Sequence, residues 1–288
     1  TTATTEECGK EEKQTNEEKT YKIAYVYDVM NLSTETNLNY LKDYFSYYET
    51  ANPEVKIELV EFNCDNDVEQ QVNDVQTCIA MNVDCVIFKY CDAEGLVDAV
   101  NEAEAAGIKM IDWLGLPETA HPTLRYIGTD ESNKGQAAKD WLNQYMDEHP
   151  EEILKVGNLC GAQAQTAQYP RYDIPEELVT ERPEQFEQLV KQYCAWTADD
   201  AMRVMEDWLQ VYPDMNCILV ASEEMTLGVI AALESAGKNP GDYIIVTYNG
   251  MDPGIEMLRK GQIRMDVANS PSVNQMLLGQ AAIRVCEG

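Results

Sequence analysis

Short apolar runs alternate with amphipathic stretches along most of the chain. The first half has four runs typical of buried strands: Lys22–Tyr27, Val55–Phe62, Asp84–Tyr90 and Ile108–Trp113. Apolar residues at helical spacing separate them, near Asn37–Ala51, Asp67–Met81 and Ala93–Ala106. Strands that alternate with helices pair in parallel through right-handed crossovers. The pattern therefore predicts an α/β fold whose ligands bind at the carboxyl ends of the strands.

The same alternation starts again in the second half. A fifth short run, Leu124–Glu131, leads into a helix predicted near Asn133–Glu148. Further strands are expected at Ile153–Cys160, Cys217–Ser222, Tyr243–Tyr248 and Ile263–Ser270, with helices over Ala198–Val211, Met225–Ala236 and Gly254–Lys260. The stretch Arg171–Gln192 is less regular, and the prolines in and beside it disfavour a long helix. Two similar halves indicate two similar lobes.

The charge balance argues against nucleic acids and anionic membranes as partners. The 288 residues include 51 acidic and 21 basic side chains, for a formal net charge of -30. Such a field repels nucleic-acid phosphates and anionic membrane surfaces. Residues 1–21 are polar and charged and are expected to form a disordered tether. Thr1 is not an initiator Met, so we expect a lost upstream segment, as in an exported protein or a lipoprotein trimmed of its signal or anchor.

The motifs of common enzymes and metal sites are not found. The nine cysteines form no CxxC, and no Cys/His spacing resembles a zinc site, so we expect no metal and no cofactor. We expect mostly free thiols, although an oxidising compartment would permit disulfides. The chain has no GxSxG, P-loop or HExxH motif, which favours a binding protein over an enzyme.

Six segments, in order and at the right spacing, carry a family resemblance: Asp65–Phe88, Tyr126–Leu142, Ala195–Leu209, Val220–Lys238, Val246–Gly254 and Val267–Gln275. Together they resemble the periplasmic sugar-binding proteins of ABC transporters, of the ribose- and galactose-binding type. The resemblance implies two doubly wound parallel-sheet lobes joined by a hinge, with the ligand in the cleft, as in the periplasmic binding protein-like I fold. Lobe 1 would comprise residues 22–128 and 270–288, and lobe 2 residues 129–269. The chain stops short of the last of three expected crossings, so either the protein continues or that crossing is missing.

The resemblance also implies a set of ligand-binding residues. Matching the motifs residue by residue gives Asn31, Asp112, Trp113, Gln165, Arg171, Trp196, Ser222, Asn249 and Asn269. A sugar needs polar groups for its hydroxyl edge and aromatic rings for its C–H faces. Two of these positions also have simpler interpretations, because Ser222 is a good helix N-cap and Asn249 begins an Asn-Gly turn.

One register is ambiguous. The resemblance puts Leu114 where the family has a polar residue, with Asp112 just before it. Either the register slips and Asp112 contacts the ligand, or the ligand carries fewer hydroxyls on that side.

These observations predict a monomeric extracytoplasmic protein that captures a small polar ligand, a sugar, by lobe closure for an ABC permease. Two alternatives share the fold: a partner that presents ligand to a sensor or chemoreceptor, and the ligand-sensing core of a LacI-type repressor. The second would need a basic helix-turn-helix at the N-terminus, where this chain is acidic.

Overall fold

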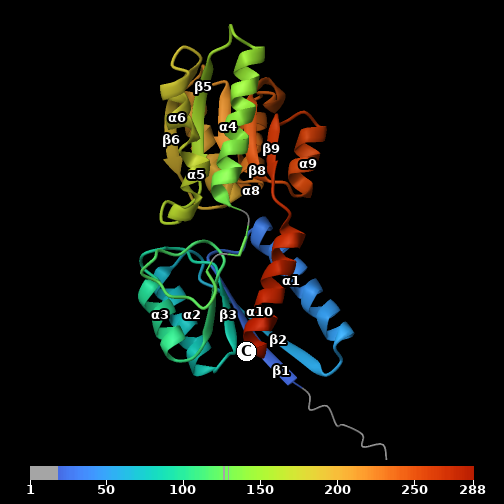
Figure 1. Ribbon diagram of the computed structural model, residues 1–288. Helices are drawn as coiled ribbons and strands as arrows, with labels where there is room; N and C mark the ends of the chain where they lie inside the picture. Colours follow the sequence, from blue (N-terminus) through green and yellow to red (C-terminus); the bar gives the residue numbers. More distant parts are fainter. Residues whose placement is uncertain (1–18, 126, 129) are drawn as a thin grey trace, which may run out of the picture.

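The computed structural model describes residues 19–125, 127–128 and 130–288, which form two α/β lobes stacked end to end (Figure 1). The described residues contain a four-stranded sheet in lobe 1, of order β2-β1-β3-β4, and a five-stranded sheet in lobe 2, of order β6-β5-β7-β8-β9. All paired strands run parallel. The predicted fold class is therefore confirmed.

Lobe 1 is built around a sheet covered on both faces. Its strands are β1 (Lys19–Tyr27), β2 (Val55–Asn63), β3 (Cys85–Phe88) and β4 (Lys109–Asp112). Its helices are α1 (Leu32–Ala51), α2 (Val68–Ala80), α3 (Val97–Ala105) and α10 (Pro271–Glu287). Helices α1 and α10 pack on one face and α2 and α3 on the other (Figure 1). Because both faces are covered, the central strands are apolar throughout.

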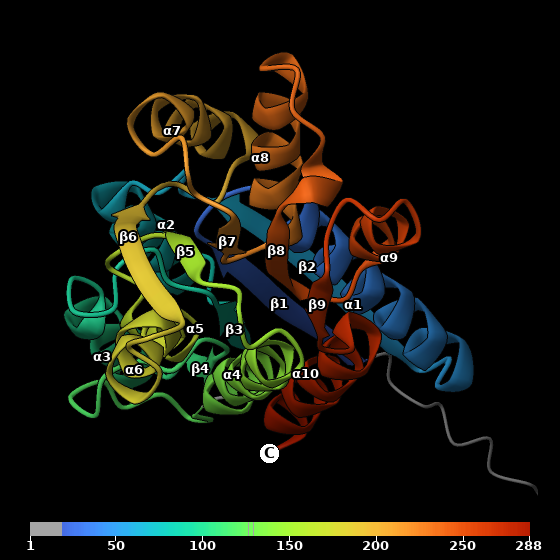
Figure 2. The same cartoon turned by 90° about the horizontal axis from the view of Figure 1, so that it is seen from above.

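Lobe 2 repeats this arrangement. Its strands are β5 (Leu154–Cys160), β6 (Phe186–Tyr193), β7 (Cys217–Val220), β8 (Ile244–Asn249) and β9 (Met265–Ala268). Its helices are α4 (Glu131–Glu148), α5 (Tyr169–Tyr172), α6 (Ile174–Glu181), α7 (Ala198–Val211), α8 (Glu223–Ser235) and α9 (Asp252–Arg259). Seen from above, α7 and α8 lie on one side of the sheet and α4, α5 and α6 on the other (Figure 2).

The chain passes between the lobes twice, from β4 to α4 and from β9 to α10. The second passage returns α10 to lobe 1, where Leu278, Ala282 and Ile283 join the same apolar cluster as Leu41 and Phe45 of α1. Lobe 1 is therefore assembled from the two ends of the sequence, with lobe 2 inserted between them.

Several boundaries differ from the sequence prediction. Strand β1 begins at Lys19, inside the expected tether, and residues 1–18 lie outside the described part. Strand β6 was not predicted, because it is an edge strand whose half-buried residues show no apolar run. In the run predicted at Leu124–Glu131, the described residues form no strand beyond an isolated bridge from Leu124 to Ile111, and Tyr126 and Thr129 lie outside the described part.

The irregular stretch contains no long helix among the described residues, as predicted, and its prolines start two short ones. Pro170 and Pro175 occupy the first turns of the short helices α5 and α6. Proline is tolerated there because the first backbone N–H groups of a helix have no intrahelical acceptor. No helix among the described residues is long and apolar enough to span a bilayer, and the eight cysteines in that part are free thiols.

Candidate functional site

A cavity lies between the lobes, at the carboxyl ends of the strands. Residues from loops of both lobes and from both passages line it, as expected for parallel α/β sheets. Among the described residues its lining comprises Asn31, Ser33, Asn37, Lys89, Trp113, Leu114, Gly128, Glu131, Lys134, Gln168, Arg171, Trp196, Ser222, Asn249, Asn269, Pro271 and Asn274.

Seven of the nine predicted residues lie in this lining: Asn31, Trp113, Arg171, Trp196, Ser222, Asn249 and Asn269. The structure therefore brings together residues from the two ends of the sequence, as in the contact of Gln275 Nε2 with Asn37 Oδ1, which are 238 positions apart. Asp112 and Gln165 are the two exceptions, and both side chains are fully buried elsewhere.

Asp112 supports a loop instead of facing the cavity. Its carboxylate accepts three backbone N–H bonds, from Leu114 at 3.0 Å, Gly115 at 2.8 Å and Leu116 at 2.7 Å. Those bonds use its acceptor capacity and fix the loop that places Trp113 and Leu114 in the cavity wall. At this position Leu114 lines the cavity and Asp112 does not, so this wall offers an apolar side chain.

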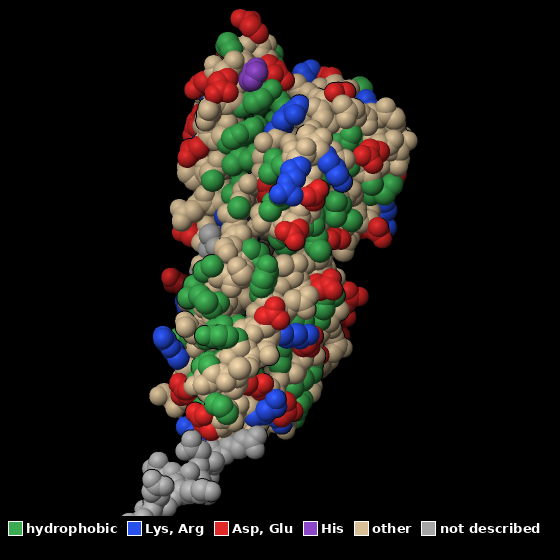
Figure 3. Space-filling view, turned by 90° about the vertical axis from the view of Figure 1, so that its right-hand side faces the viewer, with side chains coloured by type: hydrophobic (Ala, Val, Ile, Leu, Met, Phe, Trp, Pro, Cys, Tyr) green, Lys and Arg blue, Asp and Glu red, His purple; other side chains and the backbone are tan. Residues whose placement is uncertain are grey.

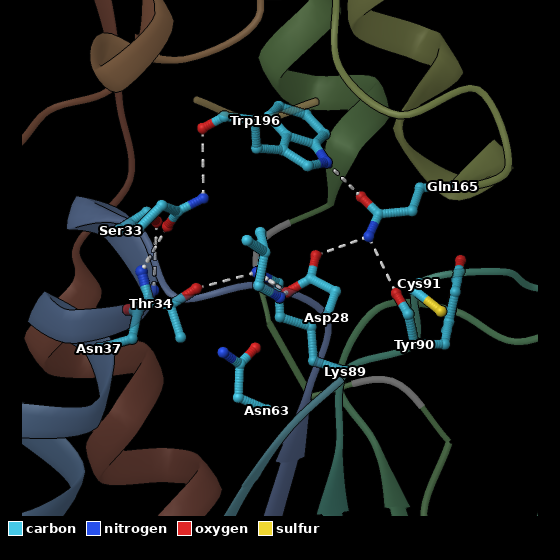
Figure 4. A network of polar contacts seen from close by, with 12 residues as sticks. Asp28, Ser33, Thr34, Asn37, Asn63, Lys89, Tyr90, Cys91, Gln165 and Trp196 are labelled. Atoms are coloured by element: carbon cyan, nitrogen blue, oxygen red, sulfur yellow. Dashed lines mark hydrogen bonds and ion pairs between the residues drawn. The ribbon is translucent and has the colours of Figure 1, made fainter. Parts of the chain in front are cut away.

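Gln165 connects the two lobes (Figure 4). Its amide donates to Asp28 Oδ2 at 2.7 Å and to the Tyr90 carbonyl at 2.9 Å, both in lobe 1. Its oxygen accepts from Trp196 Nε1 at 2.7 Å. The donors and the acceptor of this buried amide are engaged within the protein, and Gln165 lies outside the cavity lining; we refer to its bonds to lobe 1 as the latch at Gln165.

The lobe 1 side of the cavity is organised by the start of α1 and the end of β3. Asn31 is the N-cap of α1: its oxygen accepts from Thr34 N at 2.9 Å, and its amide nitrogen donates to the Trp196 carbonyl across the cleft at 3.4 Å. Lys89 follows β3 and pairs with the buried Asp28 at 2.6 Å (Figure 4). Its ammonium also lies 6.0 Å from the centre of the Trp113 ring.

On the lobe 2 side, three charged residues form a buried cluster. Arg171 binds Glu131 through Nε and through Nη2, the latter at 2.9 Å, and Nη1 donates to the Ala221 carbonyl at 3.0 Å. Lys134 pairs with the same Glu131 at 2.6 Å. Burial alone would raise the pKa of Glu131, but the two cations lower it below its usual value. Burial, together with Arg171, lowers the pKa of Lys134 to about 8.

The passage from β9 to α10 contributes the amide of Asn269, and the end of β8 contributes that of Asn249. The backbone N–H of Asn269 donates to the Asn249 carbonyl at 3.1 Å. With its side-chain amide oriented to satisfy both atoms, Asn269 donates to that carbonyl at 2.7 Å and accepts from Lys134 Nζ at 3.1 Å. Asn249 has a φ of 129°, a conformation that costs free energy for a residue with a Cβ. Strained backbone of this kind clusters at ligand-binding sites.

Trp196 and Ser222 each have a structural role beside their place in the lining. The Trp196 ring packs on Gly161, where a Cβ would lie 2.1 Å from the ring, so only glycine fits beneath it. Ser222 is the N-cap of α8 and accepts from Met225 N at 3.3 Å. The simpler interpretation of Ser222 as an N-cap is therefore correct, and these structural roles leave both residues in the cavity wall.

Sequence reasoning found Arg171 but missed the other three charged residues of the described lining. Lys89, Glu131 and Lys134 line the cavity but were not predicted to do so. A signal for Lys89 was available, because a lysine directly after a buried four-residue strand lies at the carboxyl end of the sheet. Glu131 and Lys134, three residues apart at the start of a helix, look like an ordinary surface pair in the sequence.

Comparison with known proteins gives a family and a set of distant relatives. A family model described as a periplasmic binding protein domain matches residues 29–288. A putative rhizopine-binding protein of Rhizobium meliloti is 22% identical, over 70% of this chain and 65% of that protein. A ribose import binding protein of Bacillus subtilis is 22% identical, over 77% of this chain and 70% of that protein. The chain thus spans about two thirds of the length of these relatives.

Solved structures share the fold. An ABC transporter periplasmic solute-binding protein from Actinobacillus succinogenes with bound D-allose superposes with a TM-score of 0.79, at 21% identity, over 93% of this chain and 92% of the other. One from Bacillus halodurans with bound myo-inositol gives 0.78, at 20% identity, over 96% and 91%.

Proposed function

The chain belongs to the periplasmic binding protein domain family, and on this premise we propose that it captures a small polyhydroxylated ligand, a sugar or a related polyol, between its lobes. The ligand is then delivered to an ABC importer. The relatives named above are a putative rhizopine-binding protein and a ribose import binding protein, another relative is a D-apiose import binding protein, and the similar structures hold D-allose or myo-inositol. These names define the chemical class tested first.

One observation carries the proposal: a polar cavity whose walls come from both lobes. Asn31 of lobe 1 and Asn249 of lobe 2 supply both donors and acceptors, and Trp113 and Trp196 supply aromatic surface. A ligand that contacts both lobes favours the closed arrangement by its differential affinity for that state. This is how a binding protein signals occupancy to its partner.

The family consists of binding proteins, and we propose that this chain likewise performs no chemistry on its ligand. The described residues of the cavity wall include no cysteine or histidine, and so no serine–histidine pair that could act as nucleophile and base. A protein that presents its ligand to a sensor would use the same lobe closure as one that delivers it to a permease. Identifying the partner protein distinguishes these two functions. We further propose that the protein acts outside the cytoplasm, as a monomer, with an N-terminal anchor as one means of attachment.

A thermal-shift screen followed by calorimetry tests the proposal. The panel comprises D-ribose, D-allose, D-apiose and myo-inositol, their acidic derivatives, and amino acids and nucleosides as other polar classes. We expect a sugar or polyol, neutral or acidic, to raise the melting temperature and to be recovered unchanged. Binding only in the amino-acid or nucleoside arm, or turnover of a bound sugar, contradicts the proposal.

The position of the site is tested by Trp196→Phe and Trp113→Phe. Each keeps an aromatic ring but reduces the stacking area, and Trp196→Phe also removes the bond to Gln165. We expect each to weaken the confirmed ligand at least threefold while the fold is kept. Trp141→Phe is the matched control: Trp141 is half-buried on α4, stacks on Tyr145 and does not line the cavity, so this change should leave affinity unchanged.

A further inference from the structure

The cavity has the opposite charge balance from the rest of the chain. Over the whole sequence acidic side chains outnumber basic ones, 51 to 21. On the face shown in Figure 3, acidic and basic side chains are interspersed. In the described part of the cavity lining, three basic residues, Lys89, Lys134 and Arg171, face one acidic residue, Glu131. The excess of basic residues in the cavity of an acidic chain is therefore a feature that the ligand should explain.

The local pairs neutralise two of the three cations. Lys89 is paired with Asp28, which is fully buried behind it at 2.6 Å. Arg171 holds both oxygens of Glu131 with its planar fork. Lys134 shares the carboxylate of Glu131 with Arg171. Lys134 also donates a hydrogen bond to the side-chain amide of Asn269, which is neutral. The cavity therefore keeps one positive charge in excess, centred on Lys134.

That excess charge is buried. Only 5% of Lys134 is exposed, and a cation removed from water without a full counter-charge is costly. The same imbalance is reflected in the lowered pKa of Lys134. A neutral ligand would exclude the remaining water and leave the cation without compensation, whereas an anionic group would pair with it.

We propose that the ligand is a sugar acid: a polyhydroxylated molecule with one carboxylate, which binds at Lys134 and the adjoining edge of Arg171. Its hydroxyls meet the amides of Asn31, Asn249 and Asn269. A carboxylate, with one negative charge, matches one excess positive charge, whereas a phosphate dianion overcompensates it. This inference rests on the proposed function and specifies the ligand class of that site.

Matched pairs of ligands test it by calorimetry at fixed ionic strength. The pairs are D-ribose with D-ribonate, D-galactose with D-galacturonate and D-glucose with D-glucuronate; D-ribose 5-phosphate distinguishes phosphate from carboxylate. We expect the acid of at least one pair to bind at least tenfold more tightly than its neutral partner and than the phosphate. A higher salt concentration should narrow that difference.

A charge-removing variant locates the effect. Lys134→Met keeps the side-chain length and should reduce the preference for the acid to less than threefold. Lys139→Met removes the same charge from the same helix, at a residue that pairs with Glu177 and Glu181 outside the cavity, and should keep the preference. Circular dichroism shows whether each variant is folded, and the comparison of ligands in the parent protein stands without either variant.

The outcomes separate this inference from the proposed function. If a neutral sugar binds as tightly as its acid, or the phosphate binds best, the ligand class is wrong while the proposed function stands. If no sugar, polyol or acid on either panel binds, the proposed function itself fails. A preference for the acid that survives in Lys134→Met contradicts the assignment to that residue.

Discussion

Arg171 lines the cavity and at the same time pairs with Glu131, so its side chain serves both binding and stability. Truncation of Arg171 would leave Lys134 as the one cation paired with the buried carboxylate of Glu131 in this cluster. Breaking a buried ion pair from one side costs about 3–5 kcal/mol, because the remaining charge stays desolvated. We expect Arg171→Ala to lower the free energy of unfolding by about 3 kcal/mol, measured by urea denaturation of the unliganded protein.

Arg259→Ala provides the control for this measurement. Arg259 pairs with Glu256 on the exposed face of α9, and exposed pairs contribute about 0.2–1 kcal/mol. Equal stability of the two variants would mean that the cluster around Glu131 does not stabilise lobe 2.

A second buried pair makes stability depend on pH. Glu223 is fully buried at the start of α8, beside Asp266, and its Oε1 accepts from Met251 N at 2.7 Å. Burial and the neighbouring Asp266 raise the pKa of Glu223 well above its usual value. A carboxyl whose pKa is raised in the folded state binds more protons there than in the unfolded chain. Its stabilising contribution is therefore complete below about pH 4 and is lost as the pH rises towards its folded pKa.

Glu223→Gln tests this, because an amide keeps the shape of the protonated acid but does not titrate. We expect the loss of stability between pH 5 and pH 8 to become smaller by at least about 1 kcal/mol, the equivalent of roughly one pKa unit. Glu224→Gln, one residue along, is the control and should retain the pH dependence of the parent. Parallel pH profiles for all three proteins would contradict the assignment.

A site residue could be predicted where its place at the end of a strand or the start of a helix brings it to the cavity. It could not be predicted where hydrogen bonds to the backbone determine the direction of the side chain. Asn31, Asn249 and Asn269 follow strands or precede helices, and such positions can be read from the sequence. Asp112 also follows a strand, yet its carboxylate turns to three backbone N–H groups of its own loop. That choice depends on the conformation of a loop, about which a pattern of polar and apolar residues carries no information.

At the level of elements, the close approach of α7 and α8 depends on Gly228. A Cβ there would lie 2.0 Å from the Ala198 carbonyl oxygen, a backbone atom that begins α7. Because backbone cannot move aside as a flexible side chain does, the helices must separate. We expect Gly228→Ala to destabilise lobe 2 by about 1–3 kcal/mol, despite the better helix propensity of alanine.

The matched control is Ser235→Ala, at an exposed position of the same helix. Thermal unfolding of the two variants should give a lower melting temperature for Gly228→Ala alone. A higher melting temperature for both variants would show that helix propensity outweighs packing at this contact.

The order of strands and helices could be predicted because burial imposes a period on the sequence. Central strands such as β3 and β7 are covered on both faces and read as continuous apolar runs. Strand β6 escaped prediction because, at the edge of its sheet, it mixes Glu187, Gln188 and Lys191 with apolar residues. At an edge, one row of backbone groups and much of each side chain can face water, so the constraint that produces the pattern is missing.

For the whole molecule, the latch at Gln165 sets how readily the lobes close. Its bonds to Asp28 and Tyr90 join the two lobes, so we expect them to break when the lobes separate, and it does not line the cavity. Removing a net 0.5–1.5 kcal/mol from the closed state lowers its population, and affinity falls with the closed fraction. We expect Gln165→Ala to weaken any confirmed ligand about three- to tenfold.

Gln163→Ala removes an exposed amide two residues away and should bind as the parent does. Unchanged affinity in Gln165→Ala would mean that its bonds reform equally well in the open state.

The layout of lobe 1 also decides which part of the molecule can report on closure. Strand β1 starts, and α10 ends, at the foot of lobe 1 (Figure 1), and Tyr48 of α1 donates to Glu287 there. The turn between α4 and β5 lies at the opposite end of the molecule. A fluorescent donor at the end of α10 and an acceptor at that turn would therefore span both lobes. The efficiency of energy transfer between them should change on ligand binding. A donor and acceptor placed on β1 and α10 both belong to lobe 1, so their separation and their energy-transfer efficiency should stay constant.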